Sequence, residues 1–197
     1  MLPAARLAAA LGRLPGRALE GVLYRAIDLE ALYGFHRDPP HPAPRPLFSL
    51  GPARSGARYT PRGGAPALYF AEDASTAYAE AGIGGPWRPP TVIVTARTRL
   101  ASVLDVAHKT VQAALGTSLA ELVKPWRLAA ARGQRPATHA LGQAVFDNGR
   151  FQGIRYPSAK ALGHRCVVLF PDRLAPPSFV EVHDPLGNLP QRIPPRA

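Results

Sequence analysis

ALYFAEDASTAYAEAGIGGPWRPPTVIVTA, residues 67–96, is the stretch that decides the fold. Its first five residues are apolar and β-prone, and its last six are dominated by β-branched residues, so both ends favour strands. Asp73 occupies the N-cap position of the helical segment between them, where a carboxylate accepts a hydrogen bond from the first turn. Glycines and a proline then predict a turn. The order is strand, helix, turn and strand, at 67–71, 74–83, 84–86 and 91–96.

The same reasoning, carried outward, predicts further strands on both sides of this unit. They lie at 22–26 (VLYRA), 102–106 (SVLDV), 153–156, 166–170 (CVVLF) and 179–182. Helices are predicted over 1–20 and, as two or three segments, between 108 and 148, with interruptions around Gly133 and Pro136. Strands separated by irregular loops, with helices gathered in the middle, are typical of an α+β fold and not of a regular parallel α/β sheet.

Two proline-rich segments have neither helical nor strand periodicity. Residues 38–64 form a predicted long loop. Loops beyond about 12–15 residues inside a compact domain are usually functional or mobile, so this one is a candidate wall or lid of an active site. Residues 184–197 form a tail, for which docking on a partner, docking on a second copy and disorder remain alternatives.

The length and composition of the chain predict a single soluble domain that comprises residues 1–197. The 23 prolines and 18 glycines shorten helices and strands and predict a loop-rich fold. The one cysteine, Cys166, cannot form an internal disulfide, and no apolar run reaches the roughly 18 residues of a membrane-spanning helix. Arg6 and Arg13 interrupt the apolar stretch that an export signal requires. We therefore expect a cytoplasmic protein.

The charge balance favours an anionic ligand or partner. Lys and Arg number 24 against 13 Asp and Glu, a net charge of +11, and nearly all the cations are Arg, which pairs with phosphate and carboxylate through two parallel hydrogen bonds. The cations are spread along the whole chain, however, and a composition rich in Arg, Ala, Pro and Leu also arises from GC-rich coding. The composition by itself leaves both explanations open.

Several large classes of enzyme are excluded by missing motifs. The sequence has no GxxxxGK[ST] phosphate loop, and its glycines at 82, 84 and 85 follow a helix instead of a strand, which argues against a dinucleotide-binding Rossmann fold. It has no GxSxG motif of a serine hydrolase. The six histidines have no spacing typical of a zinc site, so we expect no metal centre.

Three stretches carry the candidate chemistry: LYRA at 23–26; RYTPRGG at 58–64 followed by YFAED at 69–73 and AE at 79–80; and GIRYPSA at 153–159. Together, in this order, they resemble the RES domain, a family named for its Arg, Glu and Ser positions. Those positions match Arg25, Glu80 and Ser158, while Tyr59 and Tyr69 match the aromatic positions of the pattern. The resemblance spans about 22–174, most of the chain.

The resemblance implies a fold similar to the ADP-ribosyltransferases, with short, twisted, mostly antiparallel sheets flanked by helices. It also implies NAD as substrate, no separate cofactor, and an acidic, DNA-binding antitoxin of the Xre-like class that blocks the active site. Three departures concern fine substrate geometry: Ala57 precedes Arg58 where the pattern is glycine-rich, Thr60 occupies a position where Asn is usual, and Lys160 one where Arg is usual.

The chemistry of NAD cleavage suggests roles for these residues. Nicotinamide is a pyridinium leaving group, so one carboxylate suffices where an ordinary glycosidase needs two, and this role falls to Glu80. Arg25, and after it Arg58, are the expected partners of the pyrophosphate. Tyr59 and Tyr69 are candidates for stacking on nicotinamide or positioning ribose, and the Ser158 hydroxyl for a hydrogen bond to the substrate.

Each residue also has a structural alternative. In the structural alternative, Glu80 is a solvated helix residue. A carboxylate in the last turn of a helix, however, interacts unfavourably with the helix dipole, at a cost of about 0.3–1 kcal/mol in stability. Arg25 then reaches solvent from its strand, Tyr69 packs in the core, and Ser158 caps a short helix at 159–162. A capped turn would also fix the orientation of the Ser158 hydroxyl, so capping and a hydrogen bond to the substrate are compatible roles for this residue.

Three functions remain in competition. The first is a toxin that depletes NAD, with water or phosphate as acceptor. The second is a mono-ADP-ribosyltransferase that uses the same site on a protein target. The third is a nucleic-acid-binding protein without enzymatic activity, suggested by the net charge, although no known nucleic-acid-binding motif is present and we expect no direct nucleic-acid contact. A homodimer is a further open alternative.

Overall fold

The computed structural model describes residues 1–35, 43–82, 89–189 and 191–194. The helices are α1 (Ala4–Arg13), α2 (Leu29–Leu32), α3 (Leu50–Ser55), α4 (Ala74–Ala81), α5 (Lys109–Ala114), α6 (Leu119–Leu122), α7 (Trp126–Ala131) and α8 (Ala137–Asn148). The strands are β1 (Arg17–Asp28), β2 (Leu68–Ala71), β3 (Thr91–Asp105), β4 (Gly153–Pro157), β5 (Arg165–Leu169), β6 (Phe179–Val182) and β7 (Arg192–Ile193). The protein is therefore an α+β fold.

All seven strands belong to one sheet, in the order β1-β2-β5-β4-β3-β6-β7. β1 also pairs with β3, so the pairings close a circuit through β1, β2, β5, β4 and β3. Among the described strands, only β3 and β4 run parallel to each other, and the other pairs are antiparallel. The mostly antiparallel character expected from the sequence is confirmed, but it is one sheet with two long strands where several short ones were expected.

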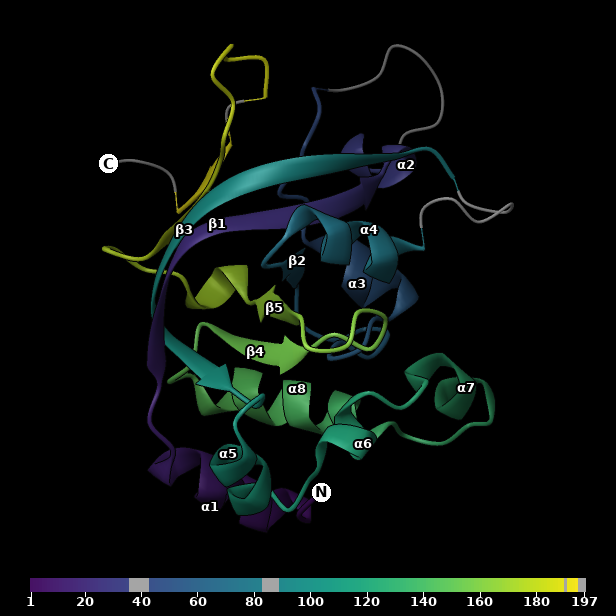
Figure 1. The fold of residues 1–197 in the computed structure, drawn as a ribbon, viewed down its shortest axis with the longest axis vertical. Coiled ribbons are helices and arrows are strands. Elements are labelled where there is room, and N and C mark those ends of the chain that lie inside the picture. The colour runs from purple at the N-terminus through teal and green to yellow at the C-terminus, as the bar shows by residue number, and fades with distance from the viewer. Residues whose placement is uncertain (36–42, 83–88, 190, 195–197) are drawn as a thin grey trace.

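The longest ladder joins β1 and β3, which run together from Arg17↔Val103 to Asp28↔Thr91 as the curved ribbon in Figure 1. β1 meets β2, in contrast, at the single pair Tyr24↔Ala71. β1 and β2 therefore separate on either side of this pair.

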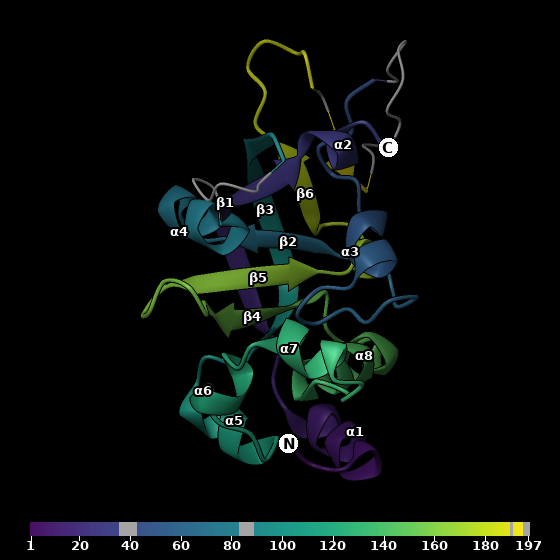
Figure 2. The ribbon, with the colours of Figure 1, turned by 90° about the vertical axis from the view of Figure 1, so that its right-hand side faces the viewer.

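The helices gather in two groups at opposite ends of the sheet (Figures 1 and 2). α1, α5, α6, α7 and α8 lie together beyond β4, whereas α2, α3 and α4 lie at the end where β1 finishes and β3 begins. The apolar residues form two buried clusters. One contains Leu11 of α1, Val145 of α8 and Phe151, and the other contains Leu23, Val94 and Val167 of the sheet.

The strand and helix predictions around residues 67–96 hold, with shifts at their ends. β2 and α4 form as expected, and Asp73 caps α4 by accepting a hydrogen bond from the Thr76 amide at 2.7 Å. The helix ends at Ala81 because Gly82 adopts a left-handed conformation with φ of 66°. The predicted turn at 84–86 lies outside the described residues.

Other boundaries were predicted wrongly. The strands expected at 91–96 and 102–106 are one strand, β3, since the residues between them continue the alternation of buried and exposed side chains. The helix expected over 1–20 ends at Arg13, because the proline and glycine at 15 and 16 stop it and β1 already begins at Arg17. Between 108 and 148 there are four helices instead of two or three, α5 to α8.

The two segments without periodicity are more ordered than expected in their described parts. The loop predicted at 38–64 contains the short helix α3 and a turn closed by the Ala57↔Thr60 bridge. In the tail, Arg192 and Ile193 form β7 against β6, and the Gln191 side chain accepts a hydrogen bond from the Leu47 amide. The described part of the tail thus packs on the protein's own sheet and on this loop.

No helix in the described ranges is both long enough and apolar enough to cross a membrane.

α8 approaches the turn at 57–60 closely at Gly142, where an added Cβ atom would stand 1.9 Å from the Tyr59 carbonyl oxygen. We predict that Gly142→Ala lowers the free energy of unfolding by about 2 kcal/mol. The added Cβ clashes with backbone atoms, so either the helix or the turn would have to shift. Gly12→Ala in α1 is the matched control, because nothing lies within 4 Å of its added Cβ.

Urea denaturation of both variants measures the effect. Alanine is the better helix former by up to about 1 kcal/mol, so Gly12→Ala should stabilise the protein slightly. A Gly142→Ala variant as stable as wild type would contradict the packing described between α8 and the turn at 57–60.

Candidate active site

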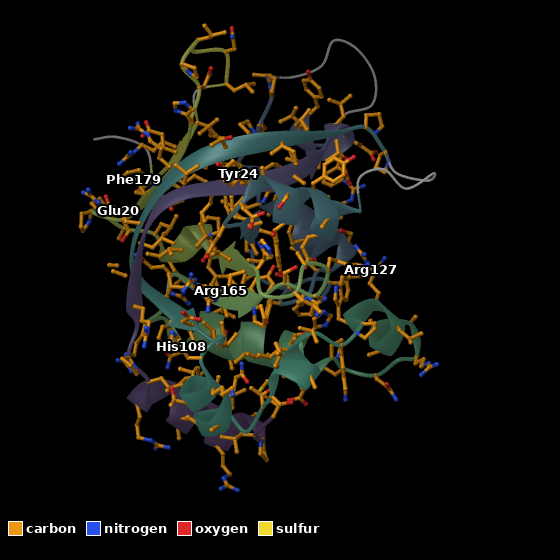
Figure 3. The ribbon with its side chains drawn as sticks, viewed as in Figure 1. Glu20, Tyr24, His108, Arg127, Arg165 and Phe179 are labelled. Carbon is orange, nitrogen blue, oxygen red and sulfur yellow. The ribbon has the colours of Figure 1, made fainter. Side chains whose placement is uncertain are left out.

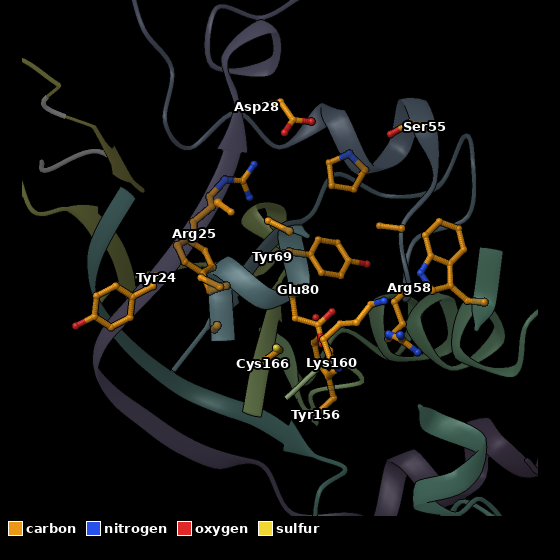
Figure 4. A pocket seen from close by; sticks show the side chains of 18 of the residues that line it. Tyr24, Arg25, Asp28, Ser55, Arg58, Tyr69, Glu80, Tyr156, Lys160 and Cys166 are labelled. Carbon is orange, nitrogen blue, oxygen red and sulfur yellow. The ribbon is translucent and has the colours of Figure 1, made fainter. Parts of the chain in front are cut away.

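A cavity of about 320 Å³ opens where β1 and β2 separate (Figure 4). Its walls come from both strands, from α3 and the turn that follows it, from α4, from the start of α7, and from the ends of β4 and β5. The described part of the loop predicted at 38–64 thus forms one wall of the cavity. Segments that are far apart in the sequence meet here, as is usual for a ligand site.

Glu80 stands on the last turn of α4 and lines this cavity. One of its carboxylate oxygens, Oε1, accepts three hydrogen bonds from the segment after β4: from the Ser158 hydroxyl at 2.6 Å, the Ala159 amide at 2.8 Å and the Lys160 amide at 3.2 Å. The other oxygen, Oε2, has no hydrogen bond to a described residue. The carboxylate is therefore fixed in orientation with one oxygen left for a ligand.

Ser158 is 1% exposed and does not line the cavity. Its hydroxyl donates to Glu80 and its Oγ accepts hydrogen bonds from the Lys160 and Ala161 amides, at 3.2 and 2.9 Å. The residues after it form a turn and not the helix that was the alternative expectation. The expected helix cap is therefore wrong; Ser158 closes a turn and positions Glu80, and its contact with a substrate stays a prediction.

Arg25 lies on the buried face of β1, 6% exposed, between Leu23 and Ile27, so the alternative in which it reaches solvent is wrong. Its Nη2 donates to the Phe48 carbonyl at 2.8 Å, its Nε is buried without a partner, and its guanidinium stands 5.9 Å from the Phe70 ring. No carboxylate of a described residue pairs with it. Burial lowers the pKa of Arg25 to about 10, so the group remains cationic at neutral pH.

Arg58 also lines the cavity, and Figure 4 shows Glu80 between Arg58 on one side and Arg25 on the other. Its Nη1 donates to the Leu122 and Lys124 carbonyls at 2.9 and 3.0 Å. This anchor joins the turn at 57–60 to the segment before α7 and leaves the rest of the guanidinium available. A buried cation without a carboxylate partner on one side and a second cation opposite it suit an anionic ligand.

The two tyrosines expected at the site differ in position. Tyr69 lines the cavity, and its hydroxyl accepts a hydrogen bond from the Tyr59 amide and bonds the Thr60 hydroxyl, both at 2.9 Å. Tyr59 is 1% exposed, packs against Tyr156 with ring centres 4.6 Å apart, and belongs to the core instead of the cavity wall. In this arrangement its backbone positions Tyr69, and its ring is not accessible for stacking on a ligand.

The sequence model of one family, described as the RES domain, matches residues 21–190. The chain belongs to the RES domain family. A chain of the crystal structure of the M. tuberculosis MbcT–MbcA toxin–antitoxin complex has a similar fold, with a TM-score of 0.59 over 91% of this chain and 90% of that chain, at 18% sequence identity. No curated protein matches the sequence significantly. The expected ADP-ribosyltransferase-like α+β fold is confirmed.

This RES domain brings four further side chains to the cavity for which the sequence predicted no role at the site. They are Tyr24, Tyr156, Lys160 and Cys166. Tyr156 also belongs to a buried core cluster, and Tyr24 packs against that cluster. The alternation in β1 and β4 placed these tyrosines on one face of each strand, but did not tell which face borders a cavity. Burial raises the pKa of the Cys166 thiol, so it stays protonated and uncharged at neutral pH.

The surroundings of the cavity are strongly basic. The sequence contains no Asp or Glu from 39 to 71 or from 122 to 146, the two stretches that supply α3, the turn at 57–60 and α7. Their cations are Arg45, Arg54, Arg58, Arg62, Lys124, Arg127, Arg132 and Arg135. Eight of the 24 cations of the chain thus lie in two stretches that contribute to the cavity walls and contain no acidic residue, while the others are spread along the rest of the chain. Within the described residues, no cluster of three or more His, Cys, Asp or Glu could hold a metal ion.

The N-cap of α4 determines where Glu80 stands, and it can be tested through stability. Hydrogen bonds from Ser75, His164 and Thr76 hold the pKa of Asp73 well below its usual range, although its side chain is 37% exposed. We predict that Asp73→Ala costs about 1 kcal/mol in the free energy of unfolding at pH 7. Asp172→Ala, at an exposed carboxylate on a short 3-10 helix, is the control and should cost little.

The pH dependence follows from the sign of the pKa shift. A carboxylate with a lowered pKa contributes its full stability above the unfolded value of about 3.9, and the contribution disappears as the pH falls through the folded value. The difference between wild type and Asp73→Ala should therefore shrink below about pH 4 in urea titrations. A difference that is unchanged down to pH 2 would contradict the role of the charge.

Proposed function

We propose that this RES domain cleaves the bond between nicotinamide and ribose in NAD and acts in the cytoplasm as the toxin of a toxin–antitoxin pair. The observation that carries the proposal is the Glu80 carboxylate, which is fixed by Ser158 through one oxygen and placed in a cavity whose other charged side chains are cationic or paired. NAD is the substrate, and the reaction requires no resident cofactor.

The reaction needs little chemical help from the protein. The bond between C1′ and the pyridinium nitrogen breaks, its electron pair goes to that nitrogen, and neutral nicotinamide leaves without a general acid. Positive charge develops on C1′ and the ring oxygen of the ribose. A carboxylate with a fixed orientation stabilises this charge, because its position costs no reorganisation when the bond breaks. An oxygen of water or phosphate then bonds to C1′ and releases a proton.

The cations explain how the substrate is held. Arg25 is buried without an acidic partner among the described residues, and a pyrophosphate would supply the counter-charge that the protein omits. The pyridinium ring is cationic, so it is attracted to Glu80 while the pyrophosphate is attracted to Arg25 and Arg58. Tyr69 and Tyr156 offer aromatic surface near Glu80 for the nicotinamide ring.

The toxin role rests on the family and on the fold, which is similar to that of a chain in a toxin–antitoxin complex. An acidic, Xre-like antitoxin suits the basic surface beside the cavity, since opposite charges accelerate association. Leu50, Leu128 and Leu162 are exposed, each on a segment that also lines the cavity, and Leu162 is 84% exposed. Apolar side chains at such a rim favour a partner that covers the site.

The proposal predicts that Glu80→Gln lowers the rate of nicotinamide release from NAD by about 100-fold or more, because the amide keeps an oxygen for Ser158 and loses the charge. Ser158→Ala should lower kcat by up to about 100-fold with little change in KM, since it disturbs the orientation of Glu80 and not its identity. The measurement is chromatography of the products from purified protein.

Glu20→Gln is the control, because Glu20 pairs with Arg99 on the exposed side of β1, far from Arg127 at the cavity (Figure 3). Reactions with and without phosphate distinguish ADP-ribose from its 1-phosphate as product. Folded protein that releases no nicotinamide under either condition would overturn the proposal. Release only in the presence of an added protein that becomes labelled would favour the transferase.

A further inference from the structure

A second cavity, of about 610 Å³, adjoins the first. The two share four lining residues, Ser55, Gly56, Trp126 and Arg127, so they meet at the turn after α3 and the start of α7. The first cavity, at about 320 Å³, is at the lower end of the range of about 300–1,000 Å³ for ligand sites, which is small for a whole dinucleotide.

Gly56 forms the boundary between the two cavities. Its φ of 81° suits glycine, and a Cβ at this position would lie 3.7 Å from the Trp126 ring. The Trp126 indole ring therefore lies directly beside the backbone of Gly56, with no side chain between them. Arg58 fixes the segment that leads to Trp126 through its hydrogen bonds to the Leu122 and Lys124 carbonyls. The position of the ring is thus tied to a residue of the first cavity.

The lining of the second cavity is cationic and aromatic. Arg62, Arg127 and Arg135 contribute guanidinium groups, and no Asp or Glu is among its lining residues. The Arg127 guanidinium stands 5.0 Å from the centre of the Trp126 ring, and the His139 ring packs against the same indole at 5.5 Å. Burial lowers the pKa of His139, so that ring is neutral at pH 7 and its Nε2 donates to the Ala57 carbonyl.

Guanidinium groups that face no carboxylate suit phosphate oxygens, and a planar aromatic ring beside them suits a nucleobase. A ligand with both features is a nucleoside monophosphate. The shared wall matters because NAD consists of two such halves joined by a pyrophosphate. Arg127 lines both cavities, so its guanidinium lies where a ligand would pass from one cavity to the other.

We propose that the second cavity binds the adenosine monophosphate half of NAD, with the adenine ring against Trp126 and Arg127. The nicotinamide and its ribose then occupy the first cavity beside Glu80, and the pyrophosphate crosses at Gly56. This inference rests on the proposed function for the identity of the substrate, but it makes its own claim about Trp126, Arg127 and Arg135. It explains why a cationic segment without acidic residues flanks the site.

The test compares binding of AMP with cleavage of NAD. We expect AMP to bind the wild-type protein in calorimetry and to compete with NAD. Trp126→Ala should weaken AMP binding and raise the KM for NAD by about tenfold, which corresponds to one base stacked on one aromatic ring. The kcat should stay unchanged, because the reacting atoms are at Glu80. Trp126→Phe keeps an aromatic ring and should recover most of the affinity.

Arg135→Ala and Arg132→Ala form a matched pair, since both residues are exposed and cationic but only Arg135 lines the cavity. Arg135→Ala should weaken AMP binding, and Arg132→Ala should not. Thermal denaturation checks that each variant is folded.

Failure of this inference and failure of the proposed function are distinguishable. If wild type cleaves NAD, but AMP does not bind or the KM is the same in Trp126→Ala, the second cavity has no part in substrate binding. If wild type binds AMP through Trp126 and never releases nicotinamide, the nucleotide site stands and the proposed reaction is wrong. Equal losses in Arg132→Ala and Arg135→Ala would reduce the effect to general surface charge and overturn the site.

Discussion

The pairing of β1 with β3 is the constraint on which the rest of this structure depends. β1 follows β3 from Asp28↔Thr91 to Arg17↔Val103, whereas it pairs with β2 at the single residue pair Tyr24↔Ala71. Where β1 and β2 are no longer paired, a cavity lies between them, and side chains from both strands line it. The cavity is therefore a consequence of the closure of the sheet, which also keeps its two walls at a fixed distance.

The charged side chains around this cavity favour the binding of a ligand at the expense of the stability of the folded protein. Arg25 is desolvated without a carboxylate partner among the described residues, and Glu80 stands at the end of α4 where the helix dipole is unfavourable. Pairing the two would relieve both costs. The protein instead holds Glu80 through Ser158 and two amides, which leaves separate cationic and anionic positions for a substrate that carries both signs.

Part of this site could be predicted from the sequence. The order of the Arg, Glu and Ser stretches identified Arg25, Glu80 and Ser158 before any contact was known, and Asp73 was identified as a cap from its position. Tyr59 was assigned a contact with substrate, yet the structure places it in the core. A strand pattern separates two faces but does not decide which borders the core and which a cavity, since that depends on the neighbouring strands.

The sequence by itself determined the features that depend on neighbours within a few residues: most strands and the capped start of α4. Tertiary structure decided the rest. The Ser158–Glu80 hydrogen bond spans 78 residues, and Arg58 reaches carbonyls more than 60 residues away. Such contacts follow from the register and closure of the sheet, which the whole chain determines together. Local propensity therefore specifies the elements, while their long-range pairing creates the site.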